Sequence, residues 1–280
     1  MDKTNKAIRQ PNTEYVLSLS YGKDSLACIE AIKRLGYPLD RIVHAEIWAT
    51  DTIPADLPPM VEFKNKARKI IKDRYGIEVE HVCATISSNE RERERNTYEK
   101  QFYKERVRHN TDELKIYGFP IIKGSWCVSN LKKAPLKVRP KPPNNVLVEY
   151  LGIAIDEKER IERHTKPNKI LPLVDIGWTE KDCYKWCEEN DLLSPIYTTA
   201  TRGGCWFCHK QSLGQLRLLR RNYPDLWNLL LKWDKDSPVT FKPDGRTVHD
   251  YDKRFALEDA GILKEGDTRF RWSQVLGDKT

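Results

Sequence analysis

Six residues near the start of the chain, from Ser20 to Ser25, have the types and spacing of a phosphate-binding loop. Backbone N–H groups at the start of a helix lack a partner inside the helix, and the helix dipole adds positive potential there, so such a loop can receive an anion. Gly22 would let the backbone approach a phosphate, and Lys23 would add a mobile charge. Asp24 or Ser25 could cap the helix. Similar turns occur in ordinary α/β proteins, so the loop alone leaves both interpretations open.

A second group with chemical potential is Cys205-Trp206-Phe207-Cys208, which follows two glycines. Two thiolates three residues apart can bind one metal ion or one cluster, although such pairs also occur as redox pairs or by structural accident. Two cysteines cannot complete a site. Cys127, in a loop after the apolar residues 120–122, is the best third ligand. His209 could supply a fourth, unless it is a surface or capping residue.

The composition indicates a globular protein of a reducing compartment. A chain of 280 residues can form one large or two modest domains, and seven cysteines are an odd number for disulfides. Cys28, Cys183 and Cys187 fall within helical patterns and are expected in the core, while Cys83 falls within a strand. With no membrane-length apolar run and no signal-peptide core, we expect a cytoplasmic protein with no membrane partner. The net charge of +8 weakly favours a polyanionic partner.

Apolar strands alternate with helical segments in the manner of a parallel sheet. Strands are expected over 15–19, 41–48, 78–84 and 146–153, and helices up to Gly36, over 59–75 and over 178–190. Successive βα units predict an α/β fold with a Rossmann-like, doubly wound and mostly parallel sheet. Ligands of such sheets bind at the carboxyl ends of strands, so Ser20–Ser25 and Thr50-Asp51-Thr52 should face one cleft.

We expect two domains: an α/β domain over residues 1–175, and a helical, cysteine-bearing part over 176–280. The charge run 89–95 predicts a solvated helix face, and 135–143 a stiff basic linker. The leucine-rich stretch 216–231 predicts a helical cap that packs on the sheet or on a partner in a homodimer. Asp244-Gly245 predicts a hairpin turn.

Basic residues follow the cysteines in two places. Such groups can hold a nucleic-acid backbone by replacing its counterions, and solvated basic faces have the same composition. The first group comprises Lys132, Lys133, Lys137, Arg139 and Lys141, and the second comprises Arg217, Arg220 and Arg221.

In their order and spacing, these motifs resemble those of the phosphoadenylyl sulfate (PAPS) reductase family, within the PP-loop ATP pyrophosphatases. The resemblance covers about residues 14–210. Ser20–Ser25 resembles the family's Ser-Gly-Gly-x-Asp-Ser loop, Asp51-Thr52 its Asp-Thr-Gly, and residues 152–160 its Gly-x-Arg-x-x-Glu-Ser-x-x-Arg element. The later landmarks are Pro172-Leu173, Trp178 to Asp182, Asn190, Pro195-Ile196-Tyr197 and Gly204-Cys205-x-x-Cys208.

Three departures from the family bear on function. The family's iron–sulfur members use a Cys-Cys pair, and Trp126 replaces its first cysteine. The remaining set of Cys127, Cys205 and Cys208 resembles the three-cysteine [4Fe–4S] clusters of PP-loop RNA thiolation enzymes, with zinc as the alternative metal. No cysteine follows Cys208, so the usual nucleophile of a sulfonucleotide reductase is missing. Ala154 stands where the family has an arginine.

The resemblance implies a fold of the adenine nucleotide alpha-hydrolase type and an ATP site. Pyrophosphate would lie on Ser20, Gly22, Lys23 and Ser25, with Asp24 and Mg²⁺ managing its charge. Lys23, Asp24 and Asp51 would be the catalytic residues. Asp51, Glu157 and Arg160 would line the nucleotide cleft, although ordinary ion pairs and helix caps would also explain them.

Three hypotheses follow. The first is an enzyme that cleaves ATP to AMP and pyrophosphate and adenylates an acceptor for sulfur transfer. That acceptor would be a small metabolite or a nucleic acid such as tRNA or DNA, with a sulfur donor protein as a further partner. The second is a sulfonucleotide reductase that uses an external thiol. The third is a nucleotide-binding accessory protein without turnover.

Overall fold

The computed structural model describes residues 8–89, 92–107, 113–121, 125–137, 141, 143–198, 203–267 and 270–273. The chain divides into two compact units. The sheet unit comprises Met1–Ile47, Asp56–Asn96 and Asn130–Gly203, and the helical unit comprises Trp48–Ala55, Thr97–Ser129 and Gly204–Thr280. The boundary expected at residue 175 falls inside the sheet unit. The chain passes between the units more than once, so no single linker separates them.

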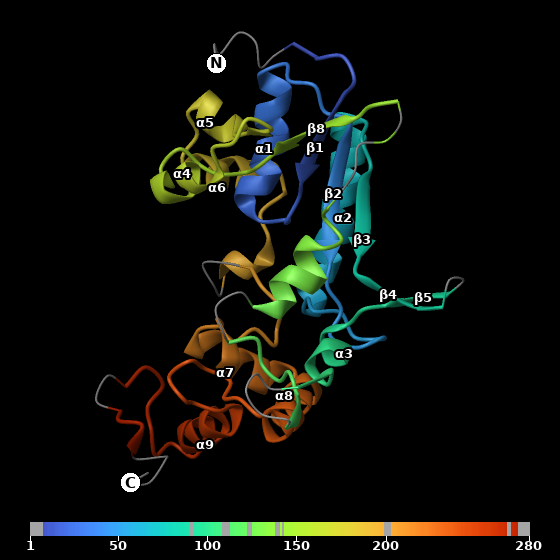
Figure 1. Ribbon diagram of the computed structural model, residues 1–280. Coiled ribbons are helices and arrows are strands. Elements are labelled where there is room, and N and C mark those ends of the chain that lie inside the picture. The colour runs from blue at the N-terminus through green and yellow to red at the C-terminus, as the bar shows by residue number, and fades with distance from the viewer. Residues whose placement is uncertain are drawn as a thin grey trace. The chain divides into compact units, whose positions relative to one another are not determined.

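A five-stranded parallel sheet forms the centre of the sheet unit (Figure 1). Its strands are β1 (Thr13–Ser18), β2 (Arg41–Glu46), β3 (Val79–Cys83), β8 (Val146–Tyr150) and β9 (Lys169–Ile170), in the order β3-β2-β1-β8-β9. The chain first builds outward from β1 to β3 and then returns to the other side of β1. The expected α/β class with a parallel sheet is confirmed, and the order is compatible with a Rossmann-like fold.

Helices flank this sheet and share its core. Helix α1 (Lys23–Arg34) packs against α5 (Pro172–Ile176) and α6 (Glu180–Glu189). Helix α2 (Pro58–Tyr75) is tied to α1 by the Tyr75 hydroxyl, which donates to Glu30 at 2.8 Å. A short helix, α4 (Lys158–His164), follows β8. The helical segments expected from periodicity therefore form, with ends shifted by one or two residues.

The core of the sheet unit follows the alternation of its strands. Tyr15 and Leu17 of β1 belong to one hydrophobic cluster with the helices, whereas the intervening Val16 is buried outside that cluster. The core positions predicted for three cysteines are confirmed, since Cys28, Cys183 and Cys187 are buried in the same cluster. Cys83 lies in β3, as predicted, and is half-buried.

The charged run at 89–95 is not helical. Strands β4 (Thr85–Asn89) and β5 (Glu92–Arg95) form an antiparallel pair in which Thr85 opposes Arg95 and Ile86 opposes Glu94. Residues 90 and 91 lie outside the described residues. Alternating Glu and Arg is compatible with either a helix face or a strand, so the charge pattern alone could not distinguish them. Of the predicted basic linker, residues 138–140 and 142, which include Arg139, also lie outside the described residues.

The helical unit is built around aromatic side chains. It contains α3 (Tyr98–Phe102), the antiparallel pair β6 (Glu105–Val107) and β7 (Leu114–Ile116), α7 (Leu213–Asn222), α8 (Pro224–Asp236) and α9 (Val248–Asp259). The leucine-rich stretch folds as two helices because Pro224 starts the second one. Fully buried rings fill the interior: Phe102, Phe119, Trp206, Trp233, Phe241 and Phe255.

The second basic group serves the packing of these helices. The Arg217 side chain is 7% exposed, and its guanidinium donates to Glu258 at 2.5 Å. Arg220 donates to Asp252 at 2.8 Å and also pairs with Asp259. Arg221 donates to Glu265 at 3.0 Å and pairs with the same Asp259. These ion pairs join α7 to α9 and to the turn that follows α9. All three arginines are thus paired with carboxylates of the protein itself.

The tail contains the turn that was expected at Asp244-Gly245, without flanking strands. Gly245 has a left-handed φ of 87°, and the Lys242 amide donates to the Arg246 carbonyl at 2.9 Å. Among the described residues, no helix combines the length and the apolar character needed to cross a membrane.

Candidate functional site

The loop between β1 and α1 is held in shape by its two serines. The Ser20 amide donates to Ser25 Oγ at 3.2 Å, and the two hydroxyl oxygens are 3.0 Å apart. Ser25 Oγ in turn donates to the Gly22 carbonyl at 3.0 Å. These bonds fix a tight turn at the carboxyl end of β1, so the expected phosphate-binding loop has a defined backbone.

Helix α1 starts without a side-chain cap in the described part of the chain. Its N-cap residue is Gly22, and the expectation that Asp24 or Ser25 caps the helix is wrong. Ser25 donates to the loop carbonyl, and Asp24 pairs with Lys23. The Lys23 amide donates instead to the hydroxyl of Tyr197, from the 3₁₀ turn η3 (Pro195–Thr198), at 3.1 Å. The dipole of this 12-residue helix still attracts anions to its start.

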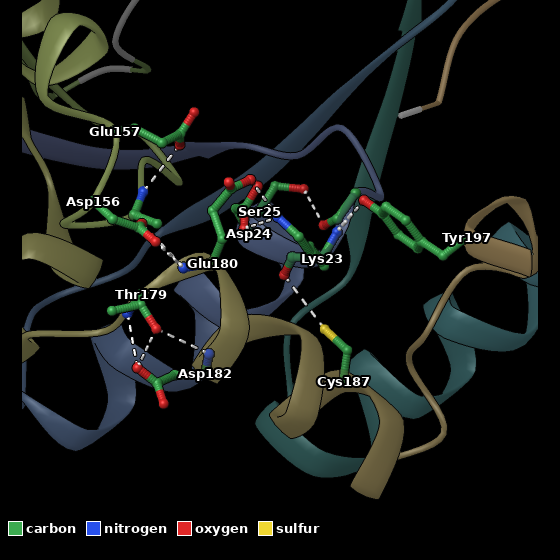
Figure 2. Close-up of polar contacts among 12 residues, drawn as sticks. Lys23, Asp24, Ser25, Asp156, Glu157, Thr179, Glu180, Asp182, Cys187 and Tyr197 are labelled. Atoms are coloured by element: carbon green, nitrogen blue, oxygen red, sulfur yellow. Dashed lines mark hydrogen bonds and ion pairs between the residues drawn. The ribbon is translucent and has the colours of Figure 1, made fainter. Parts of the chain in front are cut away.

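Lys23 lies between two carboxylates (Figure 2). Its Nζ donates to Asp24 Oδ1 at 2.8 Å and to Glu180 Oε1 at 2.7 Å. Burial disfavours its charge, but the bonds to these carboxylates raise the pKa of Lys23 above its usual value. Burial raises the pKa of Asp24, and the ammonium offsets part of that rise. The lysine is therefore a fixed cation beside the loop.

Several residues that the sequence did not assign hold this arrangement in place (Figure 2). The Asp156 carboxylate accepts from the Glu180 amide at 3.1 Å, at the start of α6. The Cys187 thiol donates to the Lys23 carbonyl at 3.3 Å. Glu180 and Tyr197 lie within landmarks of the family resemblance, which is the one signal that could have drawn attention to them.

Gly152 lets the segment after β8 lie directly against the loop. A Cβ at this position would be 2.7 Å from the Asp24 carbonyl oxygen and 2.7 Å from Ser25 Cα. Both neighbours are backbone atoms, so neither could move aside alone. Since β8 is the strand beside β1, the loop and Gly152 stand at the point where the sheet's strand order reverses. In open α/β sheets, ligands bind at that point.

Glu157 and Arg160 form an ion pair with each other. The sequence allows either such a pair or a role in the nucleotide cleft. The Glu157 carboxylate pairs with Arg160 and accepts from the Ala154 amide at 3.1 Å. These contacts shape the turn that follows Gly152, and Figure 2 shows the backbone bond to Glu157. The structure thus places Glu157 and Arg160 in the segment next to the loop, bonded to each other.

The buried side chain of Tyr21 fixes the loop to the interior of the sheet unit. Its backbone has a left-handed φ of 58°, and its side chain is fully buried. The hydroxyl bonds to His81 Nε2 at 2.9 Å, and the ring packs edge-on against His44 with centroids 4.8 Å apart. A glycine would adopt this backbone without strain, so the buried ring has to offset a backbone cost.

We therefore expect two substitutions at position 21 to differ in a way that reports this strain. Tyr21→Ala should lower the free energy of unfolding by about 3–5 kcal/mol, because it empties a buried aromatic site. Tyr21→Gly removes the same ring but relaxes the backbone, so it should be about 1–2 kcal/mol more stable than Tyr21→Ala. Chemical denaturation measures both, and equal stabilities would mean that the backbone is unstrained.

The residues around the Tyr21 ring form a polar network in the interior of the sheet unit. His44 Nδ1 donates to the Leu19 carbonyl at 2.8 Å, and Lys64 donates to His44 Nε2 at 3.0 Å. Lys64 also pairs with Asp56, and His81 lies 3.4 Å from Glu46. Burial, and then the Lys64 charge, lower the pKa of His44 to about 3. His44 is therefore neutral in the folded protein.

This shift predicts a pH-dependent stability. An unfolded histidine takes up its proton near pH 6.5, whereas folded His44 does so only near pH 3. Stability from this group is therefore complete above about pH 6.5 and is lost as the pH falls, by about 1.4 kcal/mol per pH unit. Unfolding free energies of wild type and His44→Asn should diverge by about 2 kcal/mol between about pH 6.5 and pH 5. Parallel pH profiles would contradict the prediction.

Asp51, the third expected catalytic residue, belongs to the helical unit and not to the sheet unit that contains the loop. Its carboxylate accepts from Lys100 Nζ at 2.8 Å and is 61% exposed. The contacts described above therefore bring together Ser20, Gly22, Lys23, Asp24, Ser25, Glu157 and Arg160, but they do not include Asp51.

The Cys205–Cys208 turn is secured by hydrogen bonds on both sides. The Cys208 amide donates to the Cys205 carbonyl at 3.1 Å, and Gln211 Nε2 donates to the same carbonyl at 2.8 Å. Lys242 Nζ donates to the carbonyls of His209 and Gln211, at 2.5 and 2.6 Å. Both thiols are half-buried. The turn is thus fixed by hydrogen bonds to its backbone.

Cys127 belongs to the same neighbourhood. It begins a π-helical turn, η2 (Cys127–Lys133), and is half-buried. Burial, and then the charge of Cys208, raise the pKa of Cys127 to about 11. The charges of Cys127, Cys208 and Cys205 likewise add to the effect of burial in raising the pKa of Tyr98. All three predicted ligands therefore lie within electrostatic range of one tyrosine.

The three predicted ligands, all among the described residues, are not grouped around a single metal-ion site. In the part of the chain that the structure describes, no three His, Cys, Asp or Glu side chains are grouped so that they could hold one metal ion. Zinc needs thiolates at about 2.3 Å from one centre, whereas the ligands of a cluster bind different iron atoms and stand farther apart. The buried side chain of His209 follows Cys208 and lies in the same unit.

Comparison with known proteins gives a distant likeness. No known family has a sequence model that matches the chain. The chain is 25% identical over 170 residues to an uncharacterized protein of Methanocaldococcus jannaschii, in an alignment that covers 57% of this chain and 34% of that protein. The chain thus spans about a third of the length of this curated relative. Functional inferences therefore depend on the residues themselves.

Proposed function

We propose that the protein is a PP-loop enzyme of the adenine nucleotide alpha-hydrolase type, which binds ATP and cleaves it to AMP and pyrophosphate. One observation carries this proposal. The start of α1 stands at the reversal of strand order between β1 and β8, where Gly152 packs on the loop backbone. That position combines the helix dipole with the usual ligand crevice of an open α/β sheet.

Gly22 supports a ligand that approaches the loop from outside. Its φ is −80°, which any residue adopts, and a Cβ would come no closer than 3.4 Å to the Tyr197 hydroxyl. The fold itself therefore does not require glycine at this position. A phosphate lying against the loop would require it, because a side chain there would occupy the space of the phosphate.

Lys23 and Asp24 supply opposite charges to the reaction that we propose. Lys23 would turn from Glu180 toward the phosphates, and Asp24 would hold Mg²⁺ on the pyrophosphate. An acceptor oxygen attacks the α-phosphorus, the bond to the bridging oxygen breaks, and pyrophosphate leaves with the electron pair. The chain's part in this step is positioning and charge stabilisation.

The sulfur-transfer part of the proposal concerns the helical unit. A [4Fe–4S] cluster on Cys127, Cys205 and Cys208 would supply sulfide to displace AMP from the adenylated acceptor. A polyanionic acceptor is supported by Lys132, Lys133 and Lys137, which are exposed and follow Cys127 in the chain.

ATP binding by two lysine variants tests the nucleotide site. Lys23→Met should weaken binding about 10- to 100-fold, because it removes one charge-assisted contact worth about 1.5–3 kcal/mol. Lys33→Met is the matched control, since Lys33 is an exposed residue in the last turn of the same helix. Calorimetric titration with ATP and Mg²⁺ gives both affinities. Equal affinities for wild type and Lys23→Met would exclude the loop as the phosphate site.

A further inference from the structure

The hydroxyl of Tyr98 is a buried polar group without a hydrogen-bond partner in the described part of the chain. Tyr98 is 1% exposed and opens helix α3. Buried tyrosine hydroxyls are nearly always bonded, because an unmet donor loses its bond to water and gains nothing in return. A phenylalanine would fill the same space without that cost. The hydroxyl therefore points to a partner that is not a protein group.

The surroundings of the ring show where this partner would be. The Tyr98 ring lies 4.9 Å from the ring of Trp126 and 4.1 Å from that of Phe207, between centroids. Trp126 precedes Cys127, and Phe207 precedes Cys208. Both cysteine-bearing turns are thus packed on this one side chain. The ring of Trp233, from α8, also packs on the Tyr98 ring, with the two centroids 5.1 Å apart.

Cys127, Cys208 and Cys205 all lie within electrostatic range of the Tyr98 hydroxyl. A tyrosine at neutral pH carries its proton, so it offers a donor. Thiolates and sulfide ligands are acceptors and carry negative charge. The Tyr98 hydroxyl, a donor left unpaired by the described residues, is therefore complementary to the three sulfurs, which are acceptors.

We infer that the Tyr98 hydroxyl donates a hydrogen bond to a sulfur of the iron–sulfur cluster held by Cys127, Cys205 and Cys208. This inference rests on the cluster of the proposed function and extends it by a residue that orients and tunes that cluster. Hydrogen bonds to cluster sulfurs set reduction potentials, because they stabilise the more negative, reduced state. Tyr98 therefore raises the potential of the cluster, and its ring positions the two turns that bear the ligands.

Redox titration of the anaerobically isolated full chain tests the inference. Tyr98→Phe removes only the hydroxyl, so iron and sulfide contents should match wild type while the midpoint potential falls and the visible charge-transfer band shifts. Tyr103→Phe is the matched control, because the Tyr103 hydroxyl belongs to the same unit but already donates to Asp236 at 2.6 Å. That variant should keep the wild-type potential.

A second substitution tests the same bond from the other side. Tyr98→3-fluorotyrosine makes the hydroxyl a stronger donor without emptying the site, so the midpoint potential should rise above that of wild type. Unchanged potentials in both Tyr98 variants would overturn the inference, and so would a Tyr98→Phe protein that folds but carries no iron. Wild-type protein without iron would overturn the cluster itself, which distinguishes failure of the proposed function from failure of the inference alone.

Discussion

Gly152→Ala is expected to weaken ATP binding by about 10- to 100-fold while leaving the protein folded. The added methyl would lie 2.7 Å from both the Asp24 carbonyl oxygen and Ser25 Cα, a separation that real side chains do not adopt. The first turn of α1 must then move away from β8. Loss of one charge-assisted phosphate contact, about 1.5–3 kcal/mol, corresponds to that change in affinity.

A second glycine in the same unit provides the control. At Gly203 a Cβ would meet nothing closer than the Ile196 side chain at 3.9 Å, so Gly203→Ala should bind ATP as wild type does. Calorimetric titration gives the affinities, and thermal unfolding shows whether each variant is folded. If Gly152→Ala were folded and bound ATP normally, the position of the loop beside β8 would be irrelevant to the ligand.

Loss of any one of the three predicted ligands should remove the iron. Cys127→Ala, Cys205→Ala and Cys208→Ala each leave two thiolates, which cannot hold a cluster that already lacks a fourth cysteine. We expect the variants to be colourless after anaerobic isolation, with iron and sulfide reduced to a few per cent or less of the wild-type content. Metal analysis and the visible charge-transfer absorption measure this loss.

Cys83→Ala is the matched control for these variants. Cys83 is also half-buried, but it lies in β3 of the sheet unit, so its removal should leave the iron content unchanged. If the wild type held stoichiometric zinc and no iron, or if Cys127→Ala kept its iron, the three-cysteine cluster would be wrong.

The parallel sheet could be predicted because its information is local. Each βα unit carries its own alternation of apolar residues and its own helical periodicity, and β1, α1, β2, α2 and β3 all formed near the expected residues. The helix predicted over residues 89–95 was wrong because alternating Glu and Arg fits the periodicity of a helix and that of a strand. Pairing of Thr85 with Arg95 decided the outcome.

The partners of the candidate site could not be predicted from local patterns. Glu180 is 157 residues from Lys23 along the chain, and Tyr197 is 174 residues away. Only the packing of α6 and η3 beside α1 brings them to the loop. The same is true of Arg217, whose partner Glu258 lies 41 residues further on. A group of three arginines resembled a nucleic-acid surface because the acids that bind it come from another helix.

Tyr21 shows a further limit of the sequence. A tyrosine in place of a loop glycine predicts neither its left-handed backbone nor the network that it joins. His44, Lys64 and His81 come from β2, α2 and β3, and each would be an unremarkable polar residue on its own element. Their shared burial beneath the loop arises only when the three elements pack together.

The position at which ATP is cleaved distinguishes the proposed enzyme from a sulfonucleotide reductase and from an accessory protein. Wild-type protein is incubated anaerobically with Mg²⁺ and ATP labelled at the α-phosphate, with bulk tRNA, with DNA fragments and without acceptor, and the labelled products are separated. We expect labelled AMP, with pyrophosphate released in equal amount, and about 10- to 100-fold less AMP from Gly152→Ala when ATP is well below the concentration that saturates the wild type. Labelled ADP, or no AMP under any condition while the same protein forms sulfite from phosphoadenylyl sulfate and an external thiol, would contradict it.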